Sequence, residues 1–166
     1  MRHAERINDT LLVEAADDDF EWMINGKPQG RSGLRLASGG VDDDFVLKMV
    51  RIMAQQLRAQ NCNGAWMITS GDEVVGLCSY RRPPSGGEVE IGYGVAQSRR
   101  GRGHATRAVQ DMAAVAKDAG LSALLAETSI ANPASARVLE KNSFLSIGKR
   151  TDADDGEVLQ WRRPLS

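Results

Sequence analysis

Residues 99–109 read RRGRGHATRAV, which places four arginines and two glycines in eleven positions. The stretch follows a predicted strand at 88–95 and leads into a helical pattern that begins at Ala105. The N-terminus of a helix brings together unpaired backbone N–H groups and the positive end of the helix dipole, so this junction favours an anion. Gly101 and Gly103 let the backbone approach a ligand oxygen closely because they have no Cβ. The stretch therefore predicts a loop that holds a pyrophosphate group.

Three arginines of this loop can add charge-assisted hydrogen bonds to phosphate: Arg99, Arg100 and Arg102. Other phosphate-binding motifs do not fit. A Walker loop needs GxxxxGK, but no lysine follows these glycines, and a dinucleotide loop needs GxGxxG, whereas GRGHAT ends in threonine. Two alternatives stay open: a basic loop that only caps a helix, and an RNA-binding RGG-type segment, although RRGRG occurs once and without interleaved aromatic residues.

The composition makes any anion site a local feature. The 166 residues carry 21 Lys and Arg against 22 Asp and Glu, so a protein with a broad basic face for polyanions is disfavoured. Apolar residues at 42% and charged residues at 26% are ordinary for one globular domain. The sequence contains no 18-residue apolar stretch and no basic start followed by an apolar run. We therefore expect a cytoplasmic protein that binds neither nucleic acid nor a membrane.

The chain has two cysteines, Cys62 and Cys78. They lack the close spacing and the histidine neighbours of a zinc site. We therefore expect no metal, and two free thiols in a reducing compartment.

The N-terminal part is predicted to contain two helices. Aspartates at 17–19 suit a helix N-terminus, and that helix should end before Gly26. The glycine-rich residues 26–40 are typical of a loop with low local stability. A second helix is predicted over 42–60, where apolar residues recur at helical spacing. They predict one buried stripe: Phe45, Val46, Met49, Val50, Met53 and Leu57.

Short apolar runs predict the strands of a sheet. They lie at 11–15, 65–69, 74–80, 88–95, 123–129, 144–148 and 157–161. The runs at 65–69 and 74–80 form a hairpin, and TDADDG joins the last two strands. Gly92 and Gly94 indicate a bulge or a close backbone approach in their strand.

Two further helices are predicted between the later strands. The helix 105–119 has an alanine-rich apolar face, which requires close packing on its sheet. The strand 123–129 that follows is mostly apolar, as in a parallel strand buried on both faces. A short helix then begins with Asn132 as its N-cap and Pro133 at its first position.

Residues 88–148 closely resemble the core of the GNAT superfamily of acyl-CoA-dependent N-acetyltransferases. The family signature RxxGxG/A is matched by RGRGHA at 100–105, and its downstream NxxSxRVLEKxGF pattern is matched from Asn132 to Phe144. The second block looks most like the branch that includes acetyltransferases of ribosomal-protein N-termini. The two blocks stand in the family's order and at its separation, which makes the resemblance specific.

The resemblance implies an α+β fold, a three-layer GNAT-like arrangement in which a mixed, centrally splayed β-sheet is flanked by helices on both faces. It implies one domain over residues 1–166. Within it, residues 1–62 would supply the acceptor-side helices and loop, and residues 63–166 the sheet and the acetyl-CoA-binding core. Family members often dimerise, so a homodimer is compatible with the resemblance.

The resemblance also implies acetyl-CoA as co-substrate, in a V-shaped gap between the strand ending at Val95 and the strand 123–128. The backbone around Tyr93 and Val95 would pair with pantetheine and orient the acetyl carbonyl. Asn132 would meet a pantetheine amide, and Ser135 would lie near the mouth of the gap. The pyrophosphate would be held by the amides of Arg100, Gly101, Arg102, Gly103, His104 and Ala105. The imidazole of His104 would then point elsewhere, in a surface or packing role.

The implied chemistry is direct attack of a neutral amine on the thioester, which needs a base for the acceptor and a stabilised thiolate. Glu90 is the first candidate base and Glu127 the second, and either can instead bind a cationic acceptor. Many family members carry a tyrosine as general acid where this chain has Leu139. Ser135 can donate that proton, or the thiolate can leave unprotonated. Ser143 replaces a customary glycine, so we expect either a left-handed backbone that costs about 1 kcal/mol or a different turn.

The predicted function is acetyl transfer to a primary amine, either a protein N-terminus or a small molecule. The acceptor would be bound by the N-terminal helices and by the loops 26–40 and 81–87. The aspartates at 17–19 and 42–44 can attract a cation, although such runs also serve as helix caps. The alternative is a non-catalytic module that binds or senses acyl-CoA, which the missing tyrosine supports.

Overall fold

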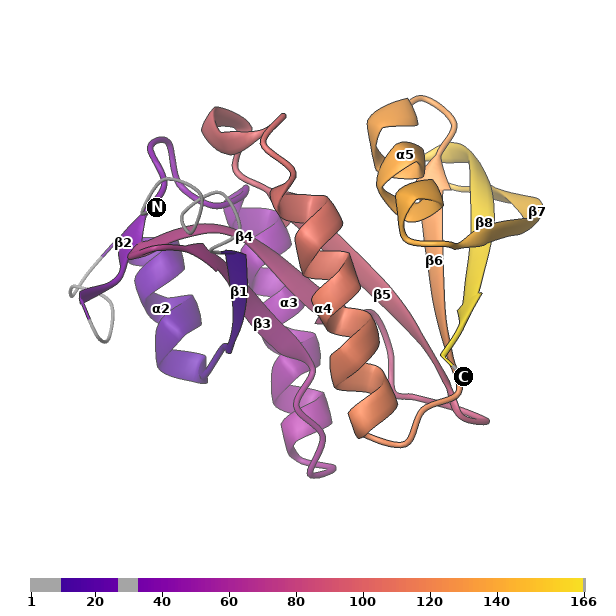
Figure 1. Cartoon of the computed structure of the whole chain (residues 1–166). Helices are drawn as coiled ribbons and strands as arrows, with labels where there is room; N and C mark the ends of the chain where they lie inside the picture. The colour runs from indigo at the N-terminus through magenta and orange to yellow at the C-terminus, as the bar shows by residue number, and fades with distance from the viewer. Residues whose placement is uncertain (1–9, 27–32, 166) are drawn as a thin grey trace, which may run out of the picture.

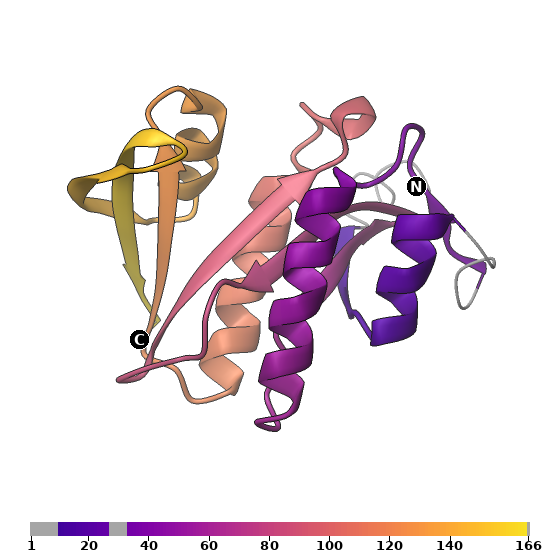
Figure 2. The ribbon, with the colours of Figure 1, turned by 180° about the vertical axis from the view of Figure 1, so that it is seen from behind.

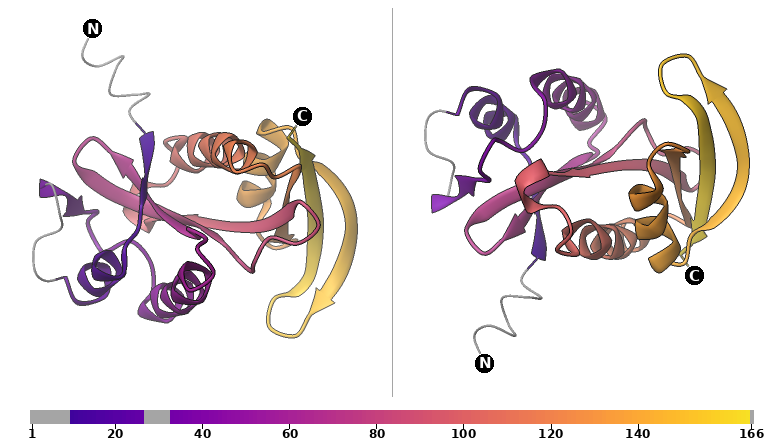
Figure 3. Two further views of the ribbon diagram at one scale, coloured as in Figure 1. Left: turned by 90° about the horizontal axis from the view of Figure 1, so that it is seen from below. Right: turned by 90° about the horizontal axis from the view of Figure 1, so that it is seen from above.

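The computed structural model describes residues 10–26 and 33–165. An eight-stranded mixed sheet, ordered β1-β3-β4-β5-β6-β8-β7 with β2 beside β4, forms its middle layer. Seen edge-on, the sheet has α2 and α3 on one face and α4 on the other (Figure 3). The predicted α+β fold is confirmed.

The strands are β1 (Thr10–Glu14), β2 (Arg35–Leu36), β3 (Ala65–Ser70), β4 (Glu73–Tyr80), β5 (Glu88–Val95), β6 (Ala123–Ser129), β7 (Leu145–Asp152) and β8 (Gly156–Pro164). The helices are α2 (Asp17–Asn25), α3 (Asp44–Arg58), α4 (His104–Asp118) and α5 (Pro133–Lys141), with a 3-10 turn at Gln97–Arg99 (Figure 1). None of the helices in the described ranges is long and apolar enough to cross a membrane.

The sheet splays at its centre. β5 pairs with β6 in parallel only from Glu88–Ala123 to Glu90–Leu125. Beyond Glu90, β5 remains paired with β4 as far as Val95, while β6 turns away to pair with β8. Figures 1 and 2 show β5 and β6 close at one end and diverging toward the other. The predicted V-shaped gap therefore exists.

Helix α4 packs closely on the sheet through small side chains. Its buried residues are Ala108, Val109, Met112, Ala113 and Ala116. They join one core with Val89 and Ile91 of β5 and Leu124 and Ala126 of β6. Because alanine adds little beyond its Cβ, the helix lies near the strands on both sides of the gap. This packing holds the N-terminus of α4 at the gap.

The predicted stripe of α3 is wrong at two of its positions. Phe45 and Met49 are 73% and 56% exposed, whereas the buried residues of the helix are Leu47, Ala54 and Leu57. Arg51 pairs with Asp17 of α2, with 2.7 Å between Nη2 and Oδ2. Contact with both α2 and the sheet sets the rotation of α3 about its axis, which leaves Phe45 and Met49 on the exposed side.

Smaller differences concern turns. Of the predicted loop 26–40, residues 27–32 lie outside the described residues, and Arg35–Leu36 forms a short strand parallel to β4 rather than loop. Strand β7 continues through Asp152, so the last turn is tighter than TDADDG. The β4–β5 register has no bulge at Gly92 or Gly94. The glycines instead mark close approaches, since a Cβ at Gly94 would lie 3.2 Å from Asp42 Oδ2.

Candidate active site

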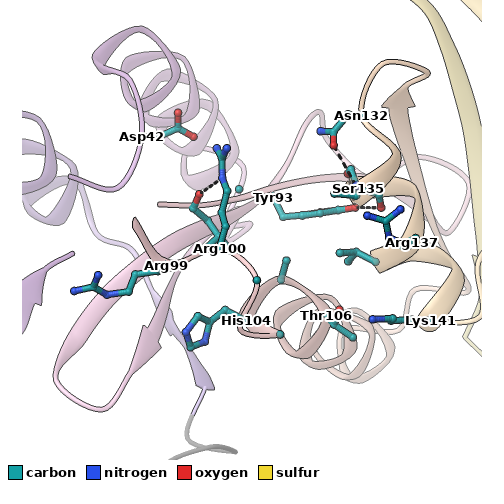
Figure 4. Close-up of a pocket in the computed structure, with 17 residues that line it drawn as sticks. Asp42, Tyr93, Arg99, Arg100, His104, Thr106, Asn132, Ser135, Arg137 and Lys141 are labelled. Atoms are coloured by element: carbon teal, nitrogen blue, oxygen red, sulfur yellow. Dashed lines mark hydrogen bonds between the residues drawn. The ribbon is translucent and has the colours of Figure 1, made fainter. Parts of the chain in front are cut away.

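The wide end of the gap opens into a pocket of about 540 Å³. It is bounded by the end of β5, the loop 99–103, the first turn of α4 and one face of α5 (Figure 4). All the predicted cofactor residues except Arg102 line it: Tyr93, Val95, Arg100, Gly101, Gly103, His104, Ala105, Asn132 and Ser135. Segments some forty residues apart in the chain therefore meet at one pocket.

The loop before α4 has the backbone that the glycines predict. Gly101 and Gly103 have φ angles of 78° and 82°, in the left-handed region, and a Cβ at either would meet nothing within 4 Å. Gly103 is the N-cap of α4, and no side chain of the described residues caps this helix. Its first N–H groups thus face the pocket without an intrahelical partner. The geometry suits a bound anion.

Two of the loop arginines line the pocket and also contact the protein. Arg99 is engaged by Glu73, with 2.5 Å from Nε to Oε1 and 3.0 Å from Nη2 to Oε2. The pKa of Glu73 is lowered, chiefly by this hydrogen bond. Arg100 Nε donates to the Val95 carbonyl at 3.2 Å and its guanidinium points toward the side of Asp42 (Figure 4). Arg99 anchors the loop to β4, and Arg102 does not line the pocket.

Sequence reasoning missed two cations on the opposite wall. Arg137 and Lys141 of α5 line the pocket and are exposed. With Ala134 and Val138 they form a face with helical spacing, i, i+3, i+4 and i+7, starting two residues after Asn132. That spacing is the sequence signal that could have identified them. The positive charge of the pocket thus comes from α5 as well as from the loop.

A hydroxyl pair bridges the gap. The Tyr93 hydroxyl donates to the Ser135 carbonyl at 3.0 Å, and its oxygen lies 2.8 Å from Ser135 Oγ. Burial raises the pKa of Tyr93 to about 12, so this hydroxyl is protonated at neutral pH. Ser135 N–H in turn donates to Asn132 Oδ1 at 3.2 Å, so Asn132 caps α5 as predicted. Leu139 is fully buried and contributes no polar group.

His104 has a structural contact. Its Nδ1 lies 3.0 Å from the Oγ1 of Thr10, a residue of β1 that is 3% exposed. Burial, and then the charge of Arg102, lowers the pKa of His104. The imidazole therefore ties the start of α4 to β1, which agrees with the expected packing role.

The two candidate carboxylates lie on the other face of the sheet. Val89 and Ile91 face the α4 core, so Glu90 between them faces the α3 side, as Glu127 does on β6. Glu90 lies 3.2 Å from Arg82 Nη2 and 3.5 Å from Arg81 Nε. These pairs hold Glu90 beside the narrow end of the gap.

The carboxylate of Glu127 makes shorter contacts with its arginine partner than the carboxylate of Glu90 does. Arg150 donates to both of its oxygens, at 2.7 and 2.6 Å, and Gln160 approaches at 3.4 Å. The hydrogen bond from Arg150 is the main cause of a lowered pKa at Glu127. Such a carboxylate binds a proton weakly and has few free lone pairs.

The two aspartate runs, at 17–19 and 42–44, lie in different surroundings. Asp42 lines the pocket rim, and its Oδ1 accepts from the Asp43 N–H at 2.7 Å. Asp17 pairs with Arg51, and Asp19 Oδ2 accepts from the Ala16 N–H at 2.7 Å. The expected role at an acceptor entrance thus fits Asp42, while Asp17 and Asp19 stabilise α2 and its packing. Within the described residues, no group of His, Cys, Asp and Glu side chains could hold a metal ion.

Known proteins share this architecture. The chain resembles the ribosomal L7/L12 alpha-N-protein acetyltransferase RimL in complex with coenzyme A, with a TM-score of 0.70, 20% identity and 94% of each chain covered. The ribosomal-protein-S5-alanine acetyltransferase from Vibrio fischeri is similar with a TM-score of 0.72 and 15% identity, and the match covers 95% of this chain and 94% of that one. An acetyltransferase from Agrobacterium tumefaciens str. C58 is similar with a TM-score of 0.66 and 24% identity, and the match covers 93% of this chain and 90% of that one.

At these identities the likeness concerns the fold, and it includes two ribosomal-protein acetyltransferases, as the resemblance predicted. No curated protein sequence matches the chain. The family profile described as acetyltransferase (GNAT) domain matches residues 42–145, which contain the splayed strands, the loop before α4 and the whole of α5. The chain therefore belongs to the GNAT acetyltransferase domain family.

Proposed function

We propose that this acetyltransferase moves an acetyl group from acetyl-CoA to a primary amine by direct attack. The observation that carries the proposal is the pocket itself, where an uncapped helix N-terminus and the open edge of a splayed strand face one another. The similar structure of RimL was solved with coenzyme A, which supports the same co-substrate here.

Different parts of the pocket bind different parts of acetyl-CoA. The first N–H groups of α4 and the amides from Arg100 to Ala105 hold the pyrophosphate. Beyond Glu90, the β6-facing edge of β5 has no strand partner, so the backbone around Tyr93 and Val95 can pair with pantetheine. Arg137 and Lys141 bring positive charge to the phosphates from α5.

For the base, the geometry favours Glu90 over Glu127. Glu127 has both oxygens bound by Arg150, whereas the side chains that contact Glu90 are 61% and 64% exposed and can move. Glu90 accepts the amine proton directly or through water, and Asp42 attracts the cationic acceptor at the rim. We expect Glu90→Gln to lower kcat by about 100-fold or more and Glu127→Gln to lower it much less.

For the leaving group, Ser135 and Tyr93 replace the absent hydroxyl at Leu139. The amine nitrogen bonds to the acetyl carbon, the carbon–sulfur bond breaks, and a proton from the hydroxyl pair reaches the thiolate. The short contact between the two hydroxyls lets either of them donate. This arrangement weakens the case for a non-catalytic acyl-CoA module.

The proposal extends to the protein as a whole. Residues 1–166 form one domain, with residues 1–62 on the acceptor side and residues 63–166 as the core. We propose that the enzyme works in the cytoplasm as a monomer or homodimer, with its acceptor either a protein N-terminus or a small amine. Cys62 and Cys78 are free thiols.

The test is continuous detection of free thiol with acetyl-CoA and a panel of peptides, polyamines and aminoglycosides. Gly103→Arg is compared with Gly156→Arg, a matched control, because both glycines have left-handed φ angles and open space for a Cβ. We expect one acceptor class to release thiol, Gly103→Arg to abolish release, and Gly156→Arg to retain it.

Other results would overturn the proposal. Acetyl-CoA that binds without thiol release for any acceptor would favour the sensing module. Thiol release that survives Gly103→Arg would place the anion site elsewhere. Binding of RNA that falls steeply with salt and survives Gly103→Arg would favour the RNA-binding alternative.

A further inference from the structure

A second cavity, of about 380 Å³, lies at the opposite end of α4 from the candidate active site. Val115, Ala119 and Leu121 form one wall, and the loop after α3 and the ends of β1, β3 and β4 form the others. In Figure 1 this end of the molecule carries the α3–β3 loop and the C-terminus of α4. The two cavities share no lining residue.

Two aromatic side chains on the floor of this cavity carry unused polar atoms. Trp66 and Tyr80 are 4% and 3% exposed, and their rings meet edge-on with centroids 5.1 Å apart. Neither Trp66 Nε1 nor Tyr80 Oη has a hydrogen-bond partner among the described residues. Every fully enclosed side-chain nitrogen or oxygen in those residues does have one. Both atoms therefore keep some accessible surface, and both residues line the cavity.

Two comparable side chains elsewhere in the fold have partners, whereas Trp22, 5% exposed, has none for its Nε1 among the described residues. Trp161 is 6% exposed and donates from Nε1 to Thr128 Oγ1 at 2.9 Å. The hydroxyl of Tyr93 has two oxygens of Ser135 as partners. A polar atom of a largely buried side chain that has no protein partner is satisfied by water or by a ligand. Two residues that line the second cavity carry such a donor.

The remaining lining defines the chemistry of an occupant. Val115, Leu121 and Pro84 present apolar surface. Among the described residues that line the cavity, the only side chain with a formal charge at neutral pH is the carboxylate of Glu14, and none is a Lys, Arg or His. Burial raises the pKa of Tyr80 to about 12, so its hydroxyl is a donor at neutral pH, like the Trp66 N–H. Because the described lining residues include no cationic side chain to pair with an anion, the two donors suit a neutral oxygen acceptor.

We propose that this cavity binds a small neutral molecule that combines an apolar ring with a hydrogen-bond-accepting oxygen. The ring packs against Val115 and Leu121, and the oxygen accepts from Trp66 Nε1–H and Tyr80 Oη–H. Its volume lies within the range of small-molecule pockets, about 300–1,000 Å³. The site is separate from the acetyl-CoA pocket and does not depend on the proposed function.

The test follows the indole N–H signals of ¹⁵N-labelled full-length protein by NMR, with Trp66 assigned from Trp66→Phe. The probes are N-methylbenzamide, acetanilide and cyclohexanone, with benzoate as the anionic counterpart. We expect at least one neutral probe to shift the Trp66 signal saturably and the Trp161 signal little, and benzoate to have no effect. Tyr80→Phe should weaken that binding about 5- to 10-fold, since one hydrogen bond is lost.

Two exposed alanines, Ala114 in α4 and Ala119 at its C-cap, give a matched pair. Ala119 lines the cavity and Ala114 does not, so Ala119→Phe should block the probe while Ala114→Phe should leave its affinity unchanged. Gly103→Arg should also leave it unchanged. The proposal is overturned if no neutral probe shifts the Trp66 signal, if benzoate binds as well as the neutral probes, or if Ala119→Phe and Tyr80→Phe bind like wild type.

Discussion

Ser143 offers a direct test of how α5 ends. Its φ angle is 64°, in the left-handed region. Phe144 N–H donates back to the Leu139 carbonyl at 3.0 Å, and Ser143 N–H donates to the Glu140 carbonyl at 3.1 Å. This is the hydrogen-bond pattern of a helix that ends through a left-handed residue, where glycine is the common choice.

We predict that Ser143→Gly stabilises the protein. The side chain of Ser143 is exposed, and its hydroxyl makes no hydrogen bond within the described residues, so its removal relieves backbone strain and loses little else. A left-handed conformation costs an L-residue about 1 kcal/mol, and the greater chain entropy of glycine offsets part of that gain. The net gain is about 0.5–1 kcal/mol, equivalent to about 1–4 °C in Tm for a domain of this size.

The assay is thermal and urea unfolding of a graded series at this position. Asparagine tolerates the left-handed region better than serine, and a β-branched residue tolerates it poorly. Stability should therefore fall in the order Gly, Asn, Ser, Val. Ser146→Gly, an exposed site on β7, is the control and should be destabilising by about 0.5–1 kcal/mol. If Ser143→Gly is no more stable than wild type, or Ser143→Val is equally stable, the account of this helix end is wrong.

Four further predictions follow from individual contacts. The lowered pKa of His104 means that the folded state resists protonation of this imidazole. The stability that neutral His104 provides is therefore complete above about pH 6.5 and is lost as the pH falls through the lowered pKa of the folded state. Urea midpoints at pH 7.5 and 5.5 should differ less in His104→Gln than in wild type. Arg99→Ala should lower the urea midpoint at neutral pH and move acid unfolding to higher pH, because the lowered pKa of Glu73 supplies stability that is lost on acidification. Gly76→Ala should cost about 3 kcal/mol in urea unfolding, since its Cβ would lie 2.2 Å from the Gly94 carbonyl oxygen; an unchanged midpoint would contradict the packing of β4 on β5. Arg137→Ala combined with Lys141→Ala should weaken acetyl-CoA binding about 10-fold and reduce its salt dependence by calorimetry, whereas Arg102→Ala should have a smaller effect.

Several features of this protein follow from the sequence alone because they depend on neighbours within a few residues. The alanine face of α4, the left-handed glycines before it and the Asn132 cap of α5 are all local patterns. Backbone conformation and helical periodicity are set over one or two turns, so a motif such as RGRGHA indicates its strand–loop–helix context without knowledge of the fold. The same applies to Ser143, whose replacement of glycine does not change the turn.

Only the tertiary structure decided which side chains meet. Arg99 has Glu73 as its partner from 26 residues away, and Glu127 has Arg150 from 23 residues away, so both side chains are already engaged by protein partners. The rotation of α3, which exposes Phe45 and Met49, depends on simultaneous contact with α2 and the sheet. Periodicity identifies an apolar face, but the choice of face to bury depends on surfaces contributed by distant segments. The contact between Tyr93 and Ser135 and the cavity over Trp66 and Tyr80 arise in the same way, since ion pairs, shared hydroxyls and voids belong to the packed arrangement of the whole chain.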